Sequence, residues 1–384
     1  MRKISLVITA RSSYTKYKTI LDNLINKKNI KIDIVCSGSA LIDKFGKVEE
    51  EIIKDGFKIG KKINFILDND EDDRPGKELS MAIFNFSEYF KEQKPDIVTV
   101  MADRYEILAP TISAAFLNIP IAHIQGGELS GNIDEKVRHS VTKLSNIHFP
   151  ATIKSMQNII QMGENKKYIF KTGCPSIDIA KRTIKNKEKL SFDIYKKYGG
   201  VGSFPNIENG YIIVMQHPVT DDNKRSGKQI IETLKAVSKI NKPVIWFWPN
   251  VDIGTDGIST NLRIFREKTK SKNFHFIKNM NPYDFLELVY FSNGIIGNSS
   301  CAIRECSFLG IPAVNIGTRQ NNRERGPNVI DVGHDHKEIY KAFNKITSKK
   351  INKSIIYGDG NAGKRIADKL EKVILVSTKK FISL

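Results

Sequence analysis

Cysteine and long apolar runs are both scarce in this chain of 384 residues. The cysteines, Cys36, Cys174, Cys301 and Cys306, show no CxxC spacing. We therefore expect neither a disulfide framework nor a zinc site, and we expect a reducing, cytoplasmic location. No segment approaches the roughly 20 apolar residues that span a bilayer, and the first apolar run is too short for a signal peptide. These absences argue against secreted disulfide-rich and membrane-spanning classes, and we expect no membrane partner.

A localised basic arm is also missing, although 61 Lys and Arg against 42 Asp and Glu give a formal net charge of +19. Lysine pairs occur along the whole chain, for example Lys27–Lys28, Lys166–Lys167 and Lys349–Lys350. We interpret this charge as solvated helix surface that attracts a small anionic substrate, and we do not expect nucleic acid as a partner.

Residues 1–174 alternate between strand-like apolar runs and helical apolar patterns. Strands are expected at residues 4–9, 32–36, 62–67, 96–101, 119–124, 147–149 and 168–172, and helices at 16–24, 41–53, 78–90, 107–116, 133–144 and 153–162. Residues 68–75 are acidic and are expected to form a loop. The near-continuous apolar run at 96–101 is typical of a strand buried on both faces. The alternation predicts a parallel α/β sheet with right-handed crossovers.

A second series follows Gly173-Cys174-Pro175-Ser176, where we place the crossing between domains, and a Gly/Pro/Asn-rich connection at 199–210. Strands are expected at 211–215, 244–248, 274–277, 294–296 and 313–316, and helices at 227–240, 261–270 and 283–290. A last helix, 362–375, is expected to return to the first domain. We predict an α/β protein of two Rossmann-like domains, 1–174 completed by 362–384, and 175–361.

Doubly wound sheets bind ligands at the carboxyl ends of their strands, so the turns after the expected strands are the informative positions. Their polar residues are Arg11, Asp103, Arg104, Gln125, Glu128, His217, Asn250, Asp252, Asn298, Ser299, Ser300 and Arg319.

The turn at 297–305 follows an expected strand and opens an expected helix. The first N–H groups of a helix have no partners within it and attract anions. Ser299 and Ser300 add hydroxyl donors, and Glu305 can accept hydrogen bonds from a sugar diol. This pattern predicts a phosphate and ribose site, but a helix N-cap built from Ser and Glu explains it equally well.

His217 and Arg319 also suit a nucleotide. His217 can donate to a phosphate and stabilise a departing nucleotide, and Arg319 can clamp a phosphate with two N–H groups. The alternatives are a structural histidine and a surface ion pair between Arg319 and Glu324.

The first domain contributes the carboxylates of Asp103, Glu128 and Asp134, together with Arg138. Clustered carboxylates suit proton transfer because burial and mutual repulsion separate their pKa values. The alternatives are a surface salt bridge between Asp134 and Arg138 on one helix face, and a helix N-cap at Asp103.

At these residues the chain resembles the UDP-N-acetylglucosamine 2-epimerase family, and in particular its hydrolysing branch. The matching segments are 102–106, 123–128, 133–135, 138–144, 173–176, 216–220, 249–252, 297–305, 317–320 and 357–362. The His-Ile-x-Gly-Gly-Glu motif at 123–128, followed by Ile133-Asp134, favours the hydrolysing branch.

The resemblance implies a glycosyltransferase-B arrangement with two domains facing across a cleft, a homodimer or homotetramer, a UDP-sugar substrate, and no metal or cofactor. It implies anti elimination of UDP across C1–C2 to give 2-acetamidoglucal, and then addition of water to give the 2-epimeric free sugar, N-acetylmannosamine. At matching positions it implies catalysis by Asp103 and Asp134, and nucleotide binding by Arg11, Arg104, His217, Ser299, Ser300, Glu305 and Arg319. We add Glu128, Gln125 and His217 as catalytic candidates, and Ser12, Arg138 and Met280 as substrate-binding candidates.

The chain departs from the family pattern at two turns. Gln125 stands where the family often has a glutamate that is thought catalytic, so Glu128, or Asp103 with Asp134, would have to act as the base. The first turn reads Arg11-Ser12-Ser13-Tyr14 instead of Arg-Ala-Asp-Tyr. Alternative functions are therefore the same reaction on a UDP- or GDP-linked 2,4-diacetamido-6-deoxy sugar, a glycosyltransferase, and a non-catalytic nucleotide-sugar binder.

Overall fold

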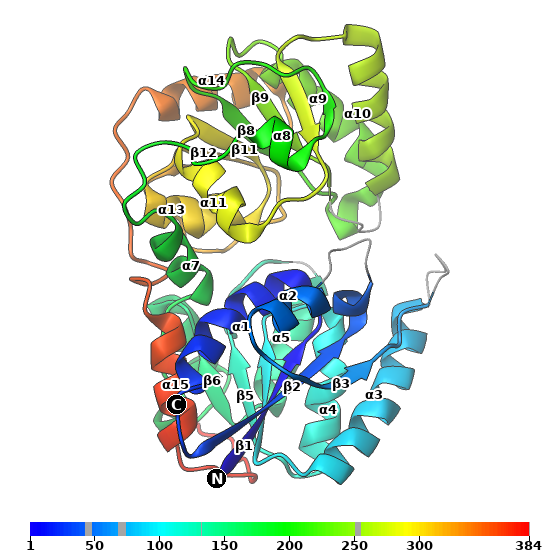
Figure 1. Ribbon diagram of the computed structural model, residues 1–384, viewed down its shortest axis with the longest axis vertical. Helices are drawn as coiled ribbons and strands as arrows, with labels where there is room; N and C mark the ends of the chain where they lie inside the picture. Colours follow the sequence, from blue (N-terminus) through cyan, green and yellow to red (C-terminus); the bar gives the residue numbers. More distant parts are fainter. Residues whose placement is uncertain (43–47, 68–73, 132, 250–254, 384) are drawn as a thin grey trace. The chain divides into compact units, whose positions relative to one another are not determined.

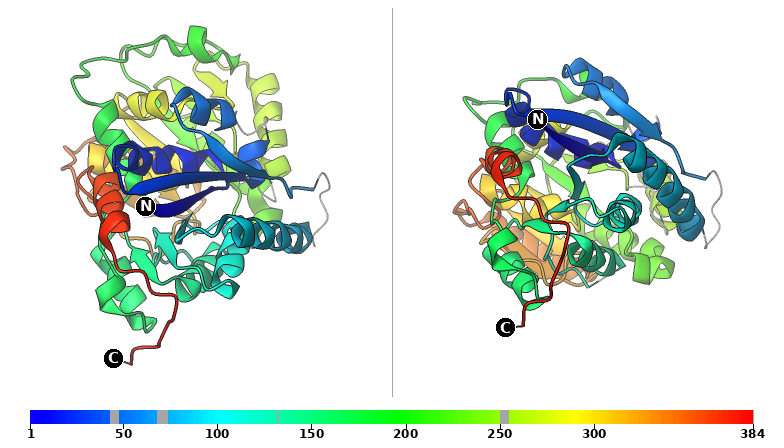
Figure 2. Two further views of the ribbon diagram at one scale, coloured as in Figure 1. Left: turned by 60° about the horizontal axis from the view of Figure 1, so that its bottom comes forward. Right: turned by 90° about the horizontal axis from the view of Figure 1, so that it is seen from below.

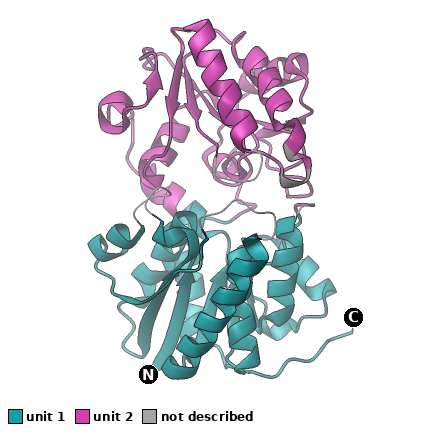
Figure 3. Ribbon diagram, turned by 90° about the vertical axis from the view of Figure 1, so that its right-hand side faces the viewer, with its two compact units in different colours: residues 1–129, 133–178, 358–384 teal, residues 130–132, 179–357 magenta. Residues whose placement is uncertain are grey.

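A computed structural model describes the chain except for residues 43–47, 68–73, 132, 250–254 and 384. The chain divides into two compact units, which are coloured separately in Figure 3. Unit 1 comprises residues 1–129, 133–178 and 358–384, and unit 2 comprises residues 130–132 and 179–357. Of the helices that are described, none is both long enough and apolar enough to cross a bilayer.

The described part of unit 1 contains a six-stranded parallel sheet, with β1 and β4 at its centre (Figure 1). In spatial order the strands are β3 (Ile59–Ile63), β2 (Ile30–Ser37), β1 (Arg2–Ile8), β4 (Ile97–Met101), β5 (Ile121–Ile124) and β6 (Ile147–Phe149). The strand order reverses between β1 and β4, which is where a doubly wound sheet opens a crevice at its carboxyl edge.

The two faces of this sheet are covered by helices. These are α1 (Arg11–Leu24), α2 (Val48–Lys54), α3 (Arg74–Gln93), α4 (Leu108–Phe116), α5 (Ile133–Leu144), α6 (Ile153–Gln161) and α15 (Ala362–Lys372). A further helix, α7 (Pro175–Thr183), begins in unit 1 and continues into unit 2, where Ile179 and Ala180 join a core cluster. Alternate residues of β1 point to opposite faces, as the pleat requires. Leu6 joins the core cluster that includes α1 and α15, and Val7 joins the cluster that includes α3 and α4.

Three of the expectations for unit 1 need correction. The strand expected at 62–67 is β3, which lies earlier, at Ile59–Ile63. The strand expected at 168–172 is absent from this described segment, which contributes one isolated bridge between Ile169 and His148 next to a short 3₁₀ turn. The helix expected at 41–53 begins as a 3₁₀ turn at Gly38–Leu41, and its last part is α2; residues 43–47 lie outside the described residues. The acidic loop expected at 68–75 also lies mostly outside them.

Unit 2 contains a second sheet, of seven strands within the described residues, and it is parallel except for β7. The order is β13 (Val329–Val332), β12 (Ala313–Ile316), β11 (Gly294–Gly297), β8 (Ile212–Met215), β9 (Val244–Phe247), β10 (Phe274–Ile277) and β7 (Val201–Gly202). Its helices are α8 (Ile194–Tyr198), α9 (Ser226–Val237), α10 (Thr255–Thr269), α11 (Pro282–Tyr290), α12 (Ser300–Ile303), α13 (Glu305–Leu309) and α14 (His336–Thr347). The predicted fold class, two mainly parallel α/β sheets, is confirmed, whereas the pattern missed β7, β13, α7, α8 and α14.

Candidate functional site

The turn after β4 is fixed by a buried histidine from β5. Ala102 has a left-handed φ of +68°, which a residue with a Cβ atom rarely adopts. His123 is fully buried, and its Nε2 lies 2.9 Å from the Ala102 carbonyl oxygen, while its Nδ1 lies 3.1 Å from Thr142 Oγ1. A carbonyl only accepts, so Nε2 carries the proton and Nδ1 accepts from Thr142. Burial lowers the pKa of His123 to about 3, so the ring is neutral and holds the turn that presents Asp103.

Asp103 is held by Arg138 of α5. The Arg138 guanidinium is fully buried, ion-pairs with the Asp103 carboxylate and donates to the Glu128 carbonyl oxygen at 2.6 Å. The Asp103 side chain keeps 19% of its surface exposed, so the carboxylate is both anchored and accessible. Arg104, and not Asp103, is the N-cap residue of the following 3₁₀ turn, which rules out the capping alternative for Asp103.

Gln125 has both ends of its amide engaged. It is 1% exposed and has a left-handed φ of +65°. Lys16 Nζ donates to its Oε1 at 2.9 Å, and its Nε2 donates to Cys174 Sγ at 2.8 Å. The side chain is therefore a fixed hydrogen-bonding group and has no capacity as a base.

The next two glycines allow this turn to pack. A Cβ atom on Gly126 would lie 2.7 Å from His123 Nδ1, and one on Gly127 would lie 2.2 Å from the Ser155 carbonyl oxygen. Gly127 also has a φ of +78°, which favours glycine. The two glycines bring Glu128 to a position where it is 4% exposed.

The remaining unit 1 candidates lie at the starts of helices. Arg11 opens α1 and pairs with Glu51 at 2.7 Å, and Arg104 pairs with the buried Glu106 at 2.8 Å. Ser12 is exposed, and Asp134 is half-buried in the first turn of α5. Ser13, which departs from the family pattern, exchanges hydrogen bonds with the backbone of Ala10.

In unit 2, the Asn298 side chain joins the turns after β8 and β11. Its Oδ1 accepts from the His217 backbone N–H at 2.7 Å, and its Nδ2 donates to the His217 carbonyl oxygen at 2.8 Å. Its own carbonyl oxygen accepts from Arg319 Nη1 at 3.3 Å and from Gln320 Nε2 at 3.0 Å. Asn298 thereby places His217 and Arg319 on one edge of the sheet.

The charges at this edge influence one another. Burial lowers the pKa of His217 to about 3, and the Arg319 guanidinium contributes in the same direction. His217 is thus a neutral imidazole. Within the described residues no ion pair joins Arg319 to Glu324. The Arg319 side chain is half-buried. This edge therefore combines a neutral donor with a cation, as a diphosphate requires.

The helix expected after Gly297 is interrupted. It is formed as α12 and α13, with a break at Arg304, whose φ and ψ are −93° and −71°. Ser299 caps α12 by accepting from the Cys301 N–H at 3.3 Å, so the capping alternative holds for Ser299, while Ser300 is half-buried beside it. Glu305 starts α13, and its Oε2 is buried without a hydrogen-bond partner among the described residues. That acceptor is suited to a hydroxyl donor such as a ribose.

The other candidates in unit 2 are Met280, the turn residues Asn250 and Asp252, and a group of possible metal ligands. Met280 is 6% exposed in the loop before α11 and packs in the core cluster there. The expected turn residues Asn250 and Asp252 lie outside the described residues. Glu232, Asp335 and His336 form a described group with metal-ligand spacing. However, His336 Nδ1 lies 2.7 Å from Glu232 Oε2, and Asp335 caps α14.

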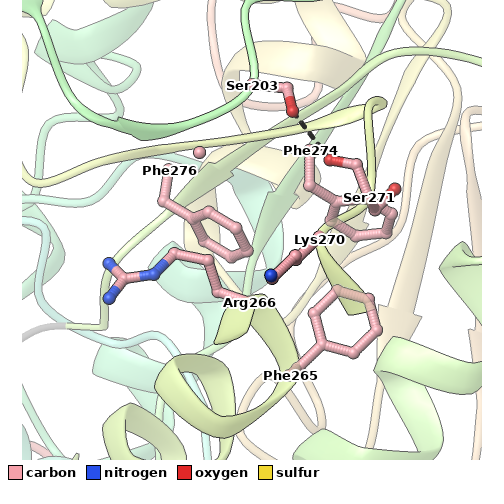
Figure 4. A pocket seen from close by; sticks show the side chains of 8 residues that line it. Ser203, Phe265, Arg266, Lys270, Ser271, Phe274 and Phe276 are labelled. Atoms are coloured by element: carbon pink, nitrogen blue, oxygen red, sulfur yellow. Dashed lines mark hydrogen bonds between the residues drawn. The ribbon is translucent and has the colours of Figure 1, made fainter. Parts of the chain in front are cut away.

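A hollow beside the edge strand β7 contains none of these candidates (Figure 4). Phe265, Phe274 and Phe276 line it together with Arg266, and Ser203 closes it by donating to the Ser271 carbonyl oxygen at 2.8 Å. It lies away from the carboxyl ends of the parallel strands, where the polar groups converge.

Sequence reasoning did not assign roles to Lys16, His123 or Asn298. His123 interrupts an otherwise apolar strand, and that pattern could have marked it as a buried polar group with a fixed partner. Lys16 carries no such signal, because its partner Gln125 is 109 residues away.

Comparison with known proteins places this geometry in a family. A family model described as UDP-N-acetylglucosamine 2-epimerase matches residues 22–371. The UDP-N,N'-diacetylbacillosamine 2-epimerase (hydrolyzing) of Legionella pneumophila is 32% identical over 378 residues, or 98% of this chain and 97% of that protein. The UDP-N-acetylglucosamine 2-epimerase of Neisseria meningitidis is 30% identical over 350 residues, or 91% of this chain and 88% of that protein.

A solved structure shows the same fold. The Methanocaldococcus jannaschii UDP-GlcNAc 2-epimerase, crystallised with UDP-GlcNAc and UDP, superposes with a TM-score of 0.80 and 21% identity over 96% of this chain and 99% of that one. The family model and the two relatives agree over nearly the whole length, so this chain belongs to the UDP-N-acetylglucosamine 2-epimerase family.

Proposed function

We propose that this protein is a hydrolysing 2-epimerase that converts UDP-N-acetylglucosamine and water to N-acetylmannosamine and UDP. The observation that carries the proposal is the accessible Asp103 carboxylate, fixed by a buried arginine and a neutral histidine in a member of this family. A carboxylate held at one place and orientation is what proton transfer to or from a carbon atom requires.

In the first step a base removes the C2 proton while the C1–O bond breaks, and the bonding electrons leave with UDP. We assign the proton transfers to Asp103, Asp134 and Glu128, because Gln125 is an amide held by Lys16. In the second step a proton returns to C2 and water adds its hydroxyl group to C1. Return of the proton on the opposite face gives the 2-epimer.

We assign the nucleotide to the carboxyl edge of unit 2. Arg319 balances diphosphate charge there, and the neutral His217 donates one hydrogen bond as the leaving group gains charge. The buried Oε2 of Glu305 accepts from a ribose hydroxyl. Ser299, Ser300 and Met280 border the same ligand. From unit 1 we assign Arg11, Ser12 and Arg104 to the UDP-sugar, with Arg11 and Arg104 at positions that match nucleotide-binding positions of the family.

A second substrate is favoured by the names of two relatives. The Legionella pneumophila and Campylobacter jejuni proteins, each 32% identical to this chain, are hydrolysing 2-epimerases of N,N'-diacetylbacillosamine linked to UDP, or to GDP or UDP. Our second candidate is therefore the same reaction on a 2,4-diacetamido-6-deoxy sugar nucleotide. We also propose that the protein is cytoplasmic and forms a homodimer or a homotetramer.

Proton NMR in deuterated water tests the proposal with each sugar nucleotide in turn. Free N-acetylmannosamine carrying deuterium at C2, with release of UDP, is expected from UDP-N-acetylglucosamine. Turnover of the diacetamido substrate alone would move the assignment to the second candidate. Binding of both without UDP release would leave a non-catalytic binder, and sugar transfer to an acceptor would indicate a glycosyltransferase.

A further inference from the structure

The chain continues beyond α15 as a strap, residues 377–382, that crosses the end of α5 within unit 1. Figure 2 follows this dark red segment from α15 to the C-terminus. The Ile382 N–H donates to the Gly163 carbonyl oxygen at 3.0 Å, and Asn146 Nδ2 donates to the Ser377 carbonyl oxygen at 3.2 Å. The Phe381 ring lies on Gly163, where an added Cβ atom would approach it to 2.3 Å.

Lys379 is the most strongly held residue of the strap. Its ammonium group donates to the carbonyl oxygens of Thr142, Lys143 and Ser145 at 3.1, 2.6 and 2.6 Å. These carbonyls lie at the C-terminal end of α5 and just beyond it, where a cation is favoured; the Thr142 carbonyl also accepts from the Ser145 N–H at 3.2 Å. A distant part of the chain therefore caps this helix.

A carboxylate keeps the ammonium in place. Glu164 Oε2 lies 2.7 Å from Lys379 Nζ, and the Glu164 side chain is 2% exposed. Glu164 also pairs with Lys143 at 2.7 Å and with His148 at 3.2 Å. Burial lowers the pKa of Lys379, and the Glu164 carboxylate opposes this by favouring the charged form.

The capped helix carries candidate residues at four-residue intervals. Asp134, Arg138 and Thr142 lie on one face of α5. Arg138 holds the Asp103 carboxylate, and Thr142 holds the His123 ring that fixes Ala102. Thr142 is also one of the residues that Lys379 contacts, so one helical turn is joined to both the strap and the turn after β4.

We propose that Lys379 is a positioning residue for the reaction, because the strap fixes the axial position and rotation of α5 and thereby the Asp103 carboxylate. The inference rests on the proposed function, and it adds a residue outside the assigned substrate-binding groups to the residues that determine turnover. Lys379 acts only through α5 and has no contact with substrate in this assignment.

The test compares Lys379→Met with Lys379→Arg and with the control Lys380→Met, at a temperature where circular dichroism shows every variant folded. Lys379→Met is expected to lower kcat roughly 10- to 100-fold, to leave KM and the Kd for UDP within about twofold, and to speed deuterium uptake in residues 133–144. Lys379→Arg should recover most of the activity, because it keeps a cation at the helix end. Lys380→Met should behave as the unmodified protein does.

The outcomes separate the two proposals. Wild-type kcat in Lys379→Met, or a loss of kcat with unchanged deuterium uptake in α5, would overturn the positioning role. A fall in UDP affinity as large as the fall in kcat would also overturn it. If the unmodified protein released UDP from neither sugar nucleotide, the proposed function would fail, and hydrogen exchange alone would then decide whether the strap fixes α5.

Discussion

Lys16 Nζ lies 2.9 Å from Gln125 Oε1. An ammonium group only donates, so this contact sets the orientation of the amide and directs Nε2 toward Cys174, 2.8 Å away. The Ala102 N–H donates to the Ile124 carbonyl oxygen at 2.9 Å, so the Lys16–Gln125 pair lies beside the turn that carries Asp103.

A Gln125→Glu variant should fold and retain kcat within about threefold. The new carboxylate would pair with Lys16, which lowers its pKa and weakens it as a base, while Asp103 and Asp134 continue the proton transfers. Steady-state kinetics measure kcat. A tenfold gain in kcat in Gln125→Glu would show that position 125 is the preferred site of the base.

Lys16→Met should destabilise unit 1 by about 1–3 kcal/mol, because the buried Gln125 Oε1 loses its donor. Urea unfolding measures this loss of stability.

Asp134→Asn should lower kcat by about 10²- to 10⁴-fold, the usual contribution of a general acid or base. The Kd for UDP should stay within about twofold, because Asp134 is not among the residues assigned to the nucleotide. Glu135→Gln, one residue along the same helix, is the matched control and should keep most activity. Full activity in Asp134→Asn would remove Asp134 from the mechanism.

Arg319→Ala should weaken UDP binding roughly 10- to 100-fold, since a hydrogen bond to a charged group contributes about 1.5–3 kcal/mol. Isothermal titration calorimetry with UDP measures it. Arg325→Ala is the control, because Arg325 already pairs with Asp331 at 2.9 Å in the same region. Equal losses in both variants would mean that the effect is only one of net charge.

Acid should destabilise both units from about pH 6.5 downward. His123 and His217 each have a pKa near 3 in the folded chain, lowered mainly by burial from 6.5. Below pH 6.5 the unfolded chain binds protons that the folded chain does not, so each histidine removes about 1.4 kcal/mol of stability per pH unit until about pH 3. Urea midpoints between pH 7 and pH 4 measure this slope. A flat profile would contradict the buried, neutral assignment.

Gly297→Ala should destabilise unit 2 by about 3 kcal/mol, the upper end of the usual cost of overpacking a core. Gly297 has a φ of +140°, and an added Cβ atom would lie 1.9 Å from the Met215 carbonyl oxygen. Gly76→Ala is the control: nothing lies within 4 Å of its added Cβ atom, and it is in α3. It should stabilise the chain by up to about 1 kcal/mol, because alanine favours a helix. Thermal unfolding distinguishes the two.

Apolar runs predicted most of the two sheets because fully buried strands such as β4 and β9 are continuous in sequence. The same signal missed β13, whose residues are only partly buried. It also predicted a strand at 168–172, where apolar side chains pack without a full ladder. The break at Arg304 has no marker in the sequence, since neither glycine nor proline stands there.

In the candidate site, too, local features were predictable from the sequence and long-range contacts were not. Residue type and the position of a turn after a strand were enough to nominate Asp103, His217 and Arg319. The partners that orient them were not predictable, because a hydrogen bond between elements far apart in the chain leaves no period in the sequence. Arg138 illustrates this: the helix spacing suggested a surface pair with Asp134, and nothing in the sequence indicated that the guanidinium is buried and pairs with Asp103.

Asn298 has a thermodynamic consequence for the nucleotide side. Its side chain and carbonyl oxygen join residues that follow β8, β11 and β12, so the contacts among these three turns exist before any ligand arrives. The turns therefore lose their conformational entropy when the chain folds, and the free energy of nucleotide binding does not include that loss. If the nucleotide binds at this edge as proposed, its affinity depends mainly on the polar groups that contact Arg319 and Glu305, and little on the mobility of the turns.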